Sequence, residues 1–156
     1  MRSFFLPITF LFLLLFSAST HAQGELTAKG GFAVNNAEAH NFLFLLKNSP
    51  NDLQELRTGI TKYIWKYHPN DKLKITQIKI GGDLENVPLI LVTGFDNKGQ
   101  AMAFYNGLKK NRPDFLQMGM TNDYFALSKT NYEQIVRNKS TEGYKAFFEQ
   151  NYLARQ

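Results

Sequence analysis

Two amphipathic helices, with two strands between them, constrain the fold of this chain more than any other feature of its sequence. In the first helix, apolar residues recur at helical spacing as far as Tyr67. In the second, Asn97 and Gln100 resemble a capping box. The apolar stripe of the second helix comprises Ala101, Phe104, Tyr105 and Leu108. Residues 68–70 and 111–113, which each contain a proline, are predicted to end the two helices.

Four short apolar runs predict strands, at residues 42–46, 73–80, 87–93 and 124–128. The first run is unbroken, which is typical of a central strand that is buried on both faces. The second run loses its alternation, and a bulge near Thr76 and Gln77 would return its apolar side chains to one face. The second and third runs are expected to form an antiparallel hairpin.

The predicted order is strand, helix, strand, strand, helix, strand, followed by helices at 131–137 and 142–152. This order is typical of an α+β ferredoxin-like fold, in which a four-stranded antiparallel sheet carries two crossover helices on one face. The opposite face is expected to be open, with the last helix covering or capping part of it. Whatever remains uncovered is predicted to be the ligand surface. The aromatic stripe of the last helix comprises Tyr144, Phe147, Phe148 and Tyr152.

Residues 1–22 are expected to be a signal peptide. Arg2 supplies the positive start, residues 4–16 form a thirteen-residue apolar window, and residues 20–22 place small side chains at the cleavage positions. A membrane anchor is the alternative, but this window is shorter than the ~20 residues that a membrane-spanning helix needs. The sequence therefore predicts export to the periplasm or beyond, with no membrane insertion after cleavage.

Residues 23–39 are predicted to be a leader or linker, and residues 40–156 a single α+β domain. The chain has no cysteine, so no disulfide or lipid attachment is expected. After residue 22 it carries 17 Lys and Arg against 13 Asp and Glu, a net charge of +4. Because these charges are dispersed, a nucleic-acid partner is not expected.

The turn between the third strand and the second helix, FDNKGQA at 95–101, lacks the pattern of a phosphate site. It has one glycine and no Gly-Lys pair before Ser or Thr, and a dinucleotide fingerprint needs three glycines. His40 and His68 are scattered, with no thiol or further histidine at ligand spacing, so surface or capping roles are expected. No catalytic residue, cofactor or metal site is predicted.

A carboxylate pair is the one enzymatic alternative that the sequence leaves open. A small hydrolase of this kind needs two acids that face each other across a cleft, ~5–10 Å apart. The acids on predicted helix surfaces, first turns or loops are Asp52, Glu55, Asp83, Glu85, Glu133, Glu142 and Glu149. Their positions are explained by structure alone, and no pair is singled out.

Trp65 is the only tryptophan of the chain. It lies one residue off the apolar stripe of the first helix, next to Ile64. Partial burial at the helix edge is expected for it, and a stacking platform for a ligand is the alternative.

Three segments carry a family resemblance: FDNKGQAMAFYNGLKKN, YFALSKTNY and YKAFFEQNY, in that order. Together they resemble the C-terminal domain of tetratricopeptide-repeat lipoproteins of the Bacteroidetes gliding-motility and type IX secretion apparatus. The resemblance covers about residues 41–152. More distantly, the element order is similar to that of sporulation-related repeat (SPOR-like) domains, which bind peptidoglycan glycan strands on an open sheet face.

The resemblance implies a non-catalytic binding or assembly module of the cell envelope, such as an accessory to gliding motility or type IX secretion. An envelope protein is the expected partner, with peptidoglycan as the alternative, and the sheet face or the C-terminal helices are the expected contact. The chain departs from the lipoproteins because it has neither helical repeats nor a lipobox cysteine. Membrane attachment and the partner surface of the repeats are therefore not implied.

Overall fold

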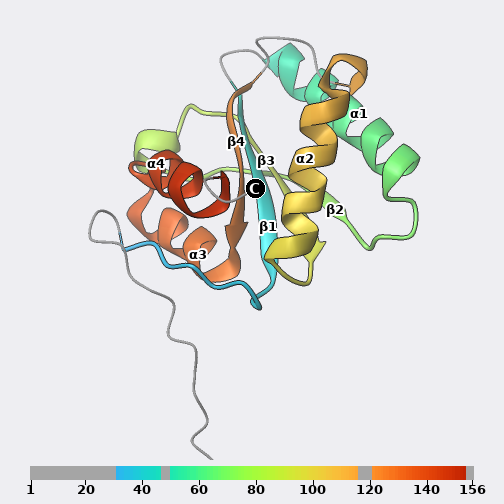
Figure 1. Cartoon of the computed structure of the whole chain (residues 1–156). Coiled ribbons are helices and arrows are strands. Elements are labelled where there is room, and N and C mark those ends of the chain that lie inside the picture. The colour runs from blue at the N-terminus through green and yellow to red at the C-terminus, as the bar shows by residue number, and fades with distance from the viewer. Residues whose placement is uncertain (1–30, 47–49, 116–120, 154–156) are drawn as a thin grey trace, which may run out of the picture.

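The computed structural model describes residues 31–46, 50–115 and 121–153 (Figure 1). The predicted signal peptide, 1–22, and residues 23–30 of the predicted leader lie outside this range. The strands are β1 (His40–Leu46), β2 (Lys74–Ile78), β3 (Leu89–Phe95) and β4 (Thr121–Ser128). The helices are α1 (Pro50–Tyr67), α2 (Lys98–Phe115), α3 (Lys129–Asn138) and α4 (Tyr144–Phe148), with short turns η1 (Gly82–Leu84) and η2 (Glu149–Leu153).

The four strands form one antiparallel sheet in the order β2-β3-β1-β4. The prediction of an α+β fold with a four-stranded antiparallel sheet is confirmed. β1 lies between β3 and β4, and all five residues of its apolar run, 42–46, are buried. The predicted β2–β3 hairpin is also confirmed.

Helices lie on both sides of this sheet, with α1 and α2 on one side and α3 and α4 on the other (Figure 1). Phe42 of β1 faces α2, and its ring centroid lies 5.0 Å from that of Phe104. Leu43 points the opposite way and is in register with Phe125, whose ring lies 5.5 Å from Tyr144 of α4. Both faces of the central strand are therefore core, as its unbroken apolar run indicates.

The second face of the sheet is covered more completely than the sequence suggests. Its apolar side chains from β1, β3 and β4 are buried: Leu43, Leu45, Leu89, Leu91, Phe125 and Leu127. The last helix does supply part of the cover, and all four residues of its aromatic stripe are buried. It is shorter than predicted, because α4 ends at Phe148 and continues as the wider π-helical turn η2.

The predicted bulge in the second strand is wrong. β2 pairs with β3 without a register shift from Lys74 to Ile78, where the strand ends. Ile80 is buried from the loop before η1 and does not need a place on the strand. The apolar pattern at 73–80 therefore combined strand residues with a loop residue that reaches the same core.

The second helix continues beyond its predicted end at 111–113. α2 runs to Phe115, whose ring lies 5.5 Å from Tyr63 and 5.9 Å from Tyr67 of α1. These aromatic contacts stabilise a last turn that a proline alone would disfavour.

The last part of the predicted leader packs against the domain. Phe32 is buried, with its ring centroid 4.9 Å from that of Tyr144 and 5.8 Å from that of Phe147. Asn131 of α3 holds the backbone of Ala33 with two hydrogen bonds, one donated by Ala33 N–H and one accepted by its carbonyl. The packed unit therefore begins before β1.

A close contact between α1 and α2 depends on a missing side chain at Gly107. A Cβ placed there would overlap the hydroxyl oxygen of buried Tyr63, while the next ring atom lies 3.5 Å away. Gly107→Ala is therefore expected to lower the free energy of unfolding by about 1–3 kcal/mol. In a Tyr63→Phe background the same change should instead stabilise by up to about 1 kcal/mol, because alanine favours a helix. Urea unfolding of the four proteins tests this, and the same sign in both backgrounds would contradict it.

Candidate binding surface

The outer face of α1 carries the most exposed large apolar side chain among the described residues. Trp65 is 78% exposed. The prediction of partial burial is therefore wrong, and the geometry suits the alternative, a ring available to a ligand. Trp65 lies on the side of α1 that faces away from the core residues Leu56 and Ile60.

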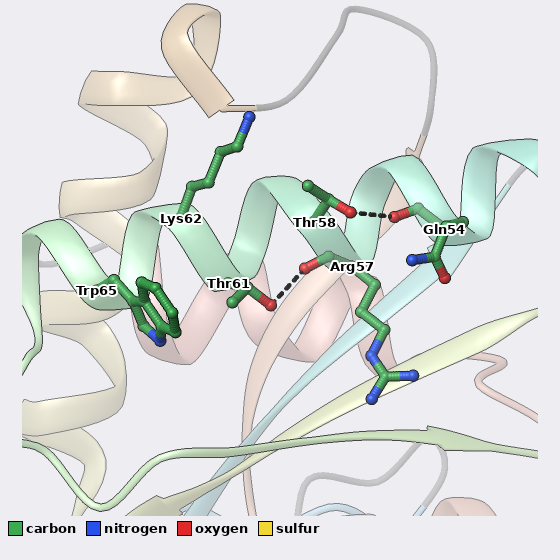
Figure 2. A pocket seen from close by; sticks show the side chains of 6 residues that line it. All are labelled: Gln54, Arg57, Thr58, Thr61, Lys62 and Trp65. Carbon is green, nitrogen blue, oxygen red and sulfur yellow. Dashed lines mark hydrogen bonds between the residues drawn. The ribbon is translucent and has the colours of Figure 1, made fainter.

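This tryptophan lines one end of a shallow hollow of about 200 Å³. We call its lining the α1 patch: Gln54, Arg57, Thr58, Thr61, Lys62 and Trp65. Figure 2 shows that Arg57 and Lys62 leave the helix in opposite directions and that Trp65 stands one turn beyond Thr61. The patch is therefore one continuous face of a single helix, flanked by two cations.

The two threonine hydroxyls of the α1 patch already donate to the helix backbone. Thr58 donates to the carbonyl of Gln54 and Thr61 to that of Arg57, each at 2.8 Å (Figure 2). Neither Arg57 nor Lys62 forms an ion pair within the part of the chain that the structure describes. The groups left to bind a ligand are thus mainly cationic or neutral donors.

A second hollow, of about 430 Å³, lies where the α1–β2 loop meets the β3–α2 turn. We call it the loop pocket, and its polar lining includes His68, Asp71, Lys72, Asp96 and Gln100. The pocket joins residues far apart in sequence because antiparallel pairing brings the start of β2 to the end of β3.

His68 is held on both sides in the loop pocket. Its Nδ1 lies 2.7 Å from the carboxylate of Asp71, and its Nε2 faces the Tyr63 hydroxyl at 3.4 Å. Burial raises the pKa of Tyr63 to about 12, so this hydroxyl stays protonated at neutral pH. The backbone N–H of His68 also donates to the carbonyl of Ile64 at the end of α1. Any non-proline residue could make this backbone bond, so a capping role of the histidine stays a prediction.

The turn before α2 is a capped joint, as the sequence predicts. Asn97 Oδ1 accepts from the backbone N–H of Gln100 at 3.0 Å. The Gln100 side chain reaches back one residue further than in a standard capping box and accepts from the N–H of Asp96. Lys98 donates to the carbonyl of Asn151 and lies 4.5 Å from the centroid of the Tyr152 ring. The side chain of Lys98 therefore binds the C-terminal segment of the chain.

His40 is buried, so the predicted surface or capping role is wrong for it. Its Nδ1 lies 2.7 Å from the carbonyl of Glu38, which accepts only, so Nδ1 carries the proton. Its Nε2 therefore accepts from the Tyr152 hydroxyl at 3.0 Å. Burial lowers the pKa of His40, and the charge of nearby Lys98 adds to this effect, while Glu38 opposes it.

This burial predicts a pH-dependent stability. As the pH falls below 6.5, the unfolded chain gains a proton on His40 before the folded chain does. The free energy of unfolding should therefore fall with pH from 6.5 until the lowered pKa of folded His40 is reached. Urea unfolding at pH 7.5 and at pH 5.5 gives the free energy of unfolding at each pH. Its decrease from pH 7.5 to pH 5.5 should be smaller for His40→Gln than for the wild-type chain. Equal losses in the two proteins would contradict this role of His40.

The acids considered as catalytic candidates do not form a site of their own. Glu55, Asp83, Glu85, Glu133, Glu142 and Glu149 are exposed, and Asp52 is half-buried in the first turn of α1. The two aspartates that share the loop pocket, Asp71 and Asp96, were missed, because only the strand pairing brings their loops together. Among the described residues, no cluster of three or more His, Cys, Asp or Glu could hold a metal ion.

Sequence reasoning also missed the α1 patch, although a signal was present. Residues 54, 58, 61, 62 and 65 share the polar side of a 3.6-residue repeat. The described helices include none with the length and apolar character needed to cross a membrane. The chain matches no protein-family model, no curated protein and no solved structure.

Proposed function

We propose that this chain is a non-catalytic, exported binding or assembly module of the bacterial cell envelope, an accessory to gliding motility or type IX secretion, with an envelope protein as its partner. The observation that carries the binding role is Trp65, which stands exposed on the same face of α1 as Arg57 and Lys62, two cations that form no ion pair with the residues that the structure describes. An exposed tryptophan costs solubility and contributes nothing to the core, which favours a role in recognition.

The partner surface that we propose is the α1 patch, in place of the sheet face. The sheet face is a poor candidate because its apolar side chains from β1, β3 and β4 are buried. The C-terminal helices are poor candidates as well, because their aromatic stripe packs inward. Within this proposal α1 is the contact element, and the sheet and remaining helices hold it in place.

A ferredoxin-like arrangement is part of this proposal. Its support is the antiparallel order β2-β3-β1-β4, in which β3 separates β1 from β2 and β1 separates β3 from β4. α1 joins β1 to β2 and α2 joins β3 to β4, so each helix crosses over one intervening strand.

The residues behind the family resemblance include many core residues. In the three resembling segments, Phe104, Phe125 and Phe148 are buried. Buried residues of this kind bear on the fold, and the three segments contain no residue of the α1 patch. Support for the envelope role therefore comes from the resemblance and the predicted signal peptide, and support for the contact surface comes from α1.

Trp65→Ala is expected to weaken envelope binding by about tenfold or more and to change the free energy of unfolding by less than about 1 kcal/mol. The affinity should fall because an aromatic anchor is lost, while the stability should hold because the side chain is exposed. Co-sedimentation of the purified protein with envelope fractions and urea unfolding measure the two quantities. Val136→Ala, which removes an exposed apolar residue of α3, is the control and should bind normally.

The same sedimentation with isolated peptidoglycan sacculi separates the two partners. Binding to membrane and protein fractions without binding to sacculi is the expected result. Binding to sacculi alone would replace the protein partner with peptidoglycan. No binding to any envelope fraction would contradict the proposed module.

A small hydrolase is the second candidate, because the loop pocket contains two aspartates. Asp71 and Asp96 both line it, beside a histidine that Asp71 holds in place. The test is release of soluble fragments from sacculi by the wild-type protein and by Asp71→Asn and Asp96→Asn. We expect no release by any of the three. Release by the wild type that either substitution abolishes would favour the hydrolase.

A further inference from the structure

The polar groups of the α1 patch that have no partner among the described residues point to a ligand with negative charge. Arg57 offers a guanidinium, Lys62 an ammonium and Trp65 an indole N–H, and all three only donate. The threonine hydroxyls have already given their protons to the backbone, and no carboxylate lines the hollow. A sugar hydroxyl needs acceptors as well as donors, which the patch supplies only through Gln54 and the threonine lone pairs.

An apolar hollow at the start of α1 points to a ligand with apolar side chains. This hollow of about 180 Å³ is lined by Leu53, which precedes Gln54 in α1, and by residues at the end of β2 and before β3. Leu53, Ile78, Val87 and Pro88 form its apolar lining, and Lys79 and Glu85 are its charged residues. A glycan has few apolar groups that could fill an aliphatic hollow, whereas a protein segment can place an apolar side chain in it.

The length of the patch sets the size of this ligand. Arg57 and Trp65 lie eight residues apart on α1, so about 12 Å separates them along the helix axis. An extended segment of about four residues covers this distance. A carboxylate near Arg57 or Lys62 and an apolar side chain at Trp65 therefore fit within one short stretch of a partner.

We infer that the α1 patch docks a short acidic segment of a partner protein, in which aspartate or glutamate pairs with Arg57 and Lys62 and a neighbouring apolar side chain packs on Trp65. This inference rests on the proposed function, because it names the chemistry of the partner at the same surface. Docking of this kind weakens as salt rises, since exposed charges supply part of the attraction.

A random dodecapeptide display library, panned against the purified protein, tests the inference. Enriched peptides should contain aspartate or glutamate next to apolar residues. One of them, synthesised with a fluorescent label, should lose affinity about tenfold or more for the double variant Arg57→Glu with Lys62→Glu, and for Trp65→Ala. The control double variant, Lys110→Glu with Lys129→Glu, makes the same charge change on α2 and α3 and should bind normally.

Each other outcome overturns the inference. Enriched peptides without acidic residues, or peptides that bind the Arg57 and Lys62 double variant as well as the wild type, would exclude an acidic segment at this patch. No enrichment, together with Trp65-dependent sedimentation on sacculi, would exclude a peptide ligand and leave an envelope-binding module intact. No enrichment together with no envelope binding would remove the proposed function as well.

Discussion

Phe104→Ala is expected to lower the free energy of unfolding by about 3–5 kcal/mol, the largest loss for any single substitution considered for this chain. Phe104 lies in α2, and its ring centroid is 5.0 Å from Phe42, 5.2 Å from Tyr63 and 5.3 Å from Phe95. It thus joins α1, α2 and two strands of the sheet at one point. The neighbours of Phe104 are closely packed, so they can move little to fill the cavity that the substitution creates. Most of the loss in the free energy of unfolding should therefore remain.

Trp65→Ala is the matched comparison for this prediction. It removes a larger side chain, yet that side chain is mostly exposed. Urea unfolding should therefore show a large loss in the free energy of unfolding for Phe104→Ala. It should show almost none for Trp65→Ala, although that substitution removes more atoms. A loss below about 1 kcal/mol for Phe104→Ala would mean that this ring does not join α1, α2 and the sheet.

Gly94→Ala should lower the free energy of unfolding by about 2–4 kcal/mol, for two independent reasons. The backbone of Gly94 has a φ of +110°, which side-chain-bearing residues rarely adopt. A Cβ there would also lie 2.5 Å from the carbonyl oxygen of Lys72 and 3.3 Å from the Cα of Leu73. These neighbours are backbone atoms, which cannot rotate away as the end of a side chain can.

Gly99→Ala is the control for this second prediction. Gly99 lies in the first turn of α2, has no positive φ, and its nearest atom is the side-chain oxygen of Asn97 at 3.2 Å. Its stability should change by less than about 1 kcal/mol in chemical denaturation. Equal costs at Gly94 and Gly99 would contradict the close approach between the α1–β2 loop and the end of β3.

The core could be predicted because hydrophobic spacing reports burial directly. The stripe Ala101, Phe104, Tyr105 and Leu108 is buried in full, and so are the run 42–46 and the aromatic stripe of the tail. The helical stripes match the period of a helix, and the unbroken run matches a central strand that is buried on both faces. Local signals also located the cap at Asn97, which depends on residues three positions apart.

Predictions that depended on where an element ends were less successful. Ile80 was assigned to a strand, although it reaches the core from a loop. The proline-containing segment 111–113 predicts a helix end. The helix instead runs to Phe115, whose ring contacts α1. Both outcomes depend on tertiary contacts, which a local pattern does not contain.

The candidate surfaces were harder to predict than the core. The loop pocket depends on strand pairing between segments that are distant in sequence. The α1 patch was local, but apolar residues are so often buried that Trp65 was assigned to the helix edge. Its spacing from Thr58, at seven residues, places both on the same solvent-facing side of α1. The position of Trp65 on the helix was thus more informative than its residue type.

The central claim, that the outer face of α1 docks a partner, is tested most directly by a photo-crosslinking residue placed at position 65 in cells of the source organism. Position 136, where an exposed valine lies on α3, is the matched control. We predict a discrete adduct with an envelope protein from position 65 and none from position 136. An adduct from position 136 with none from position 65 would contradict the claim.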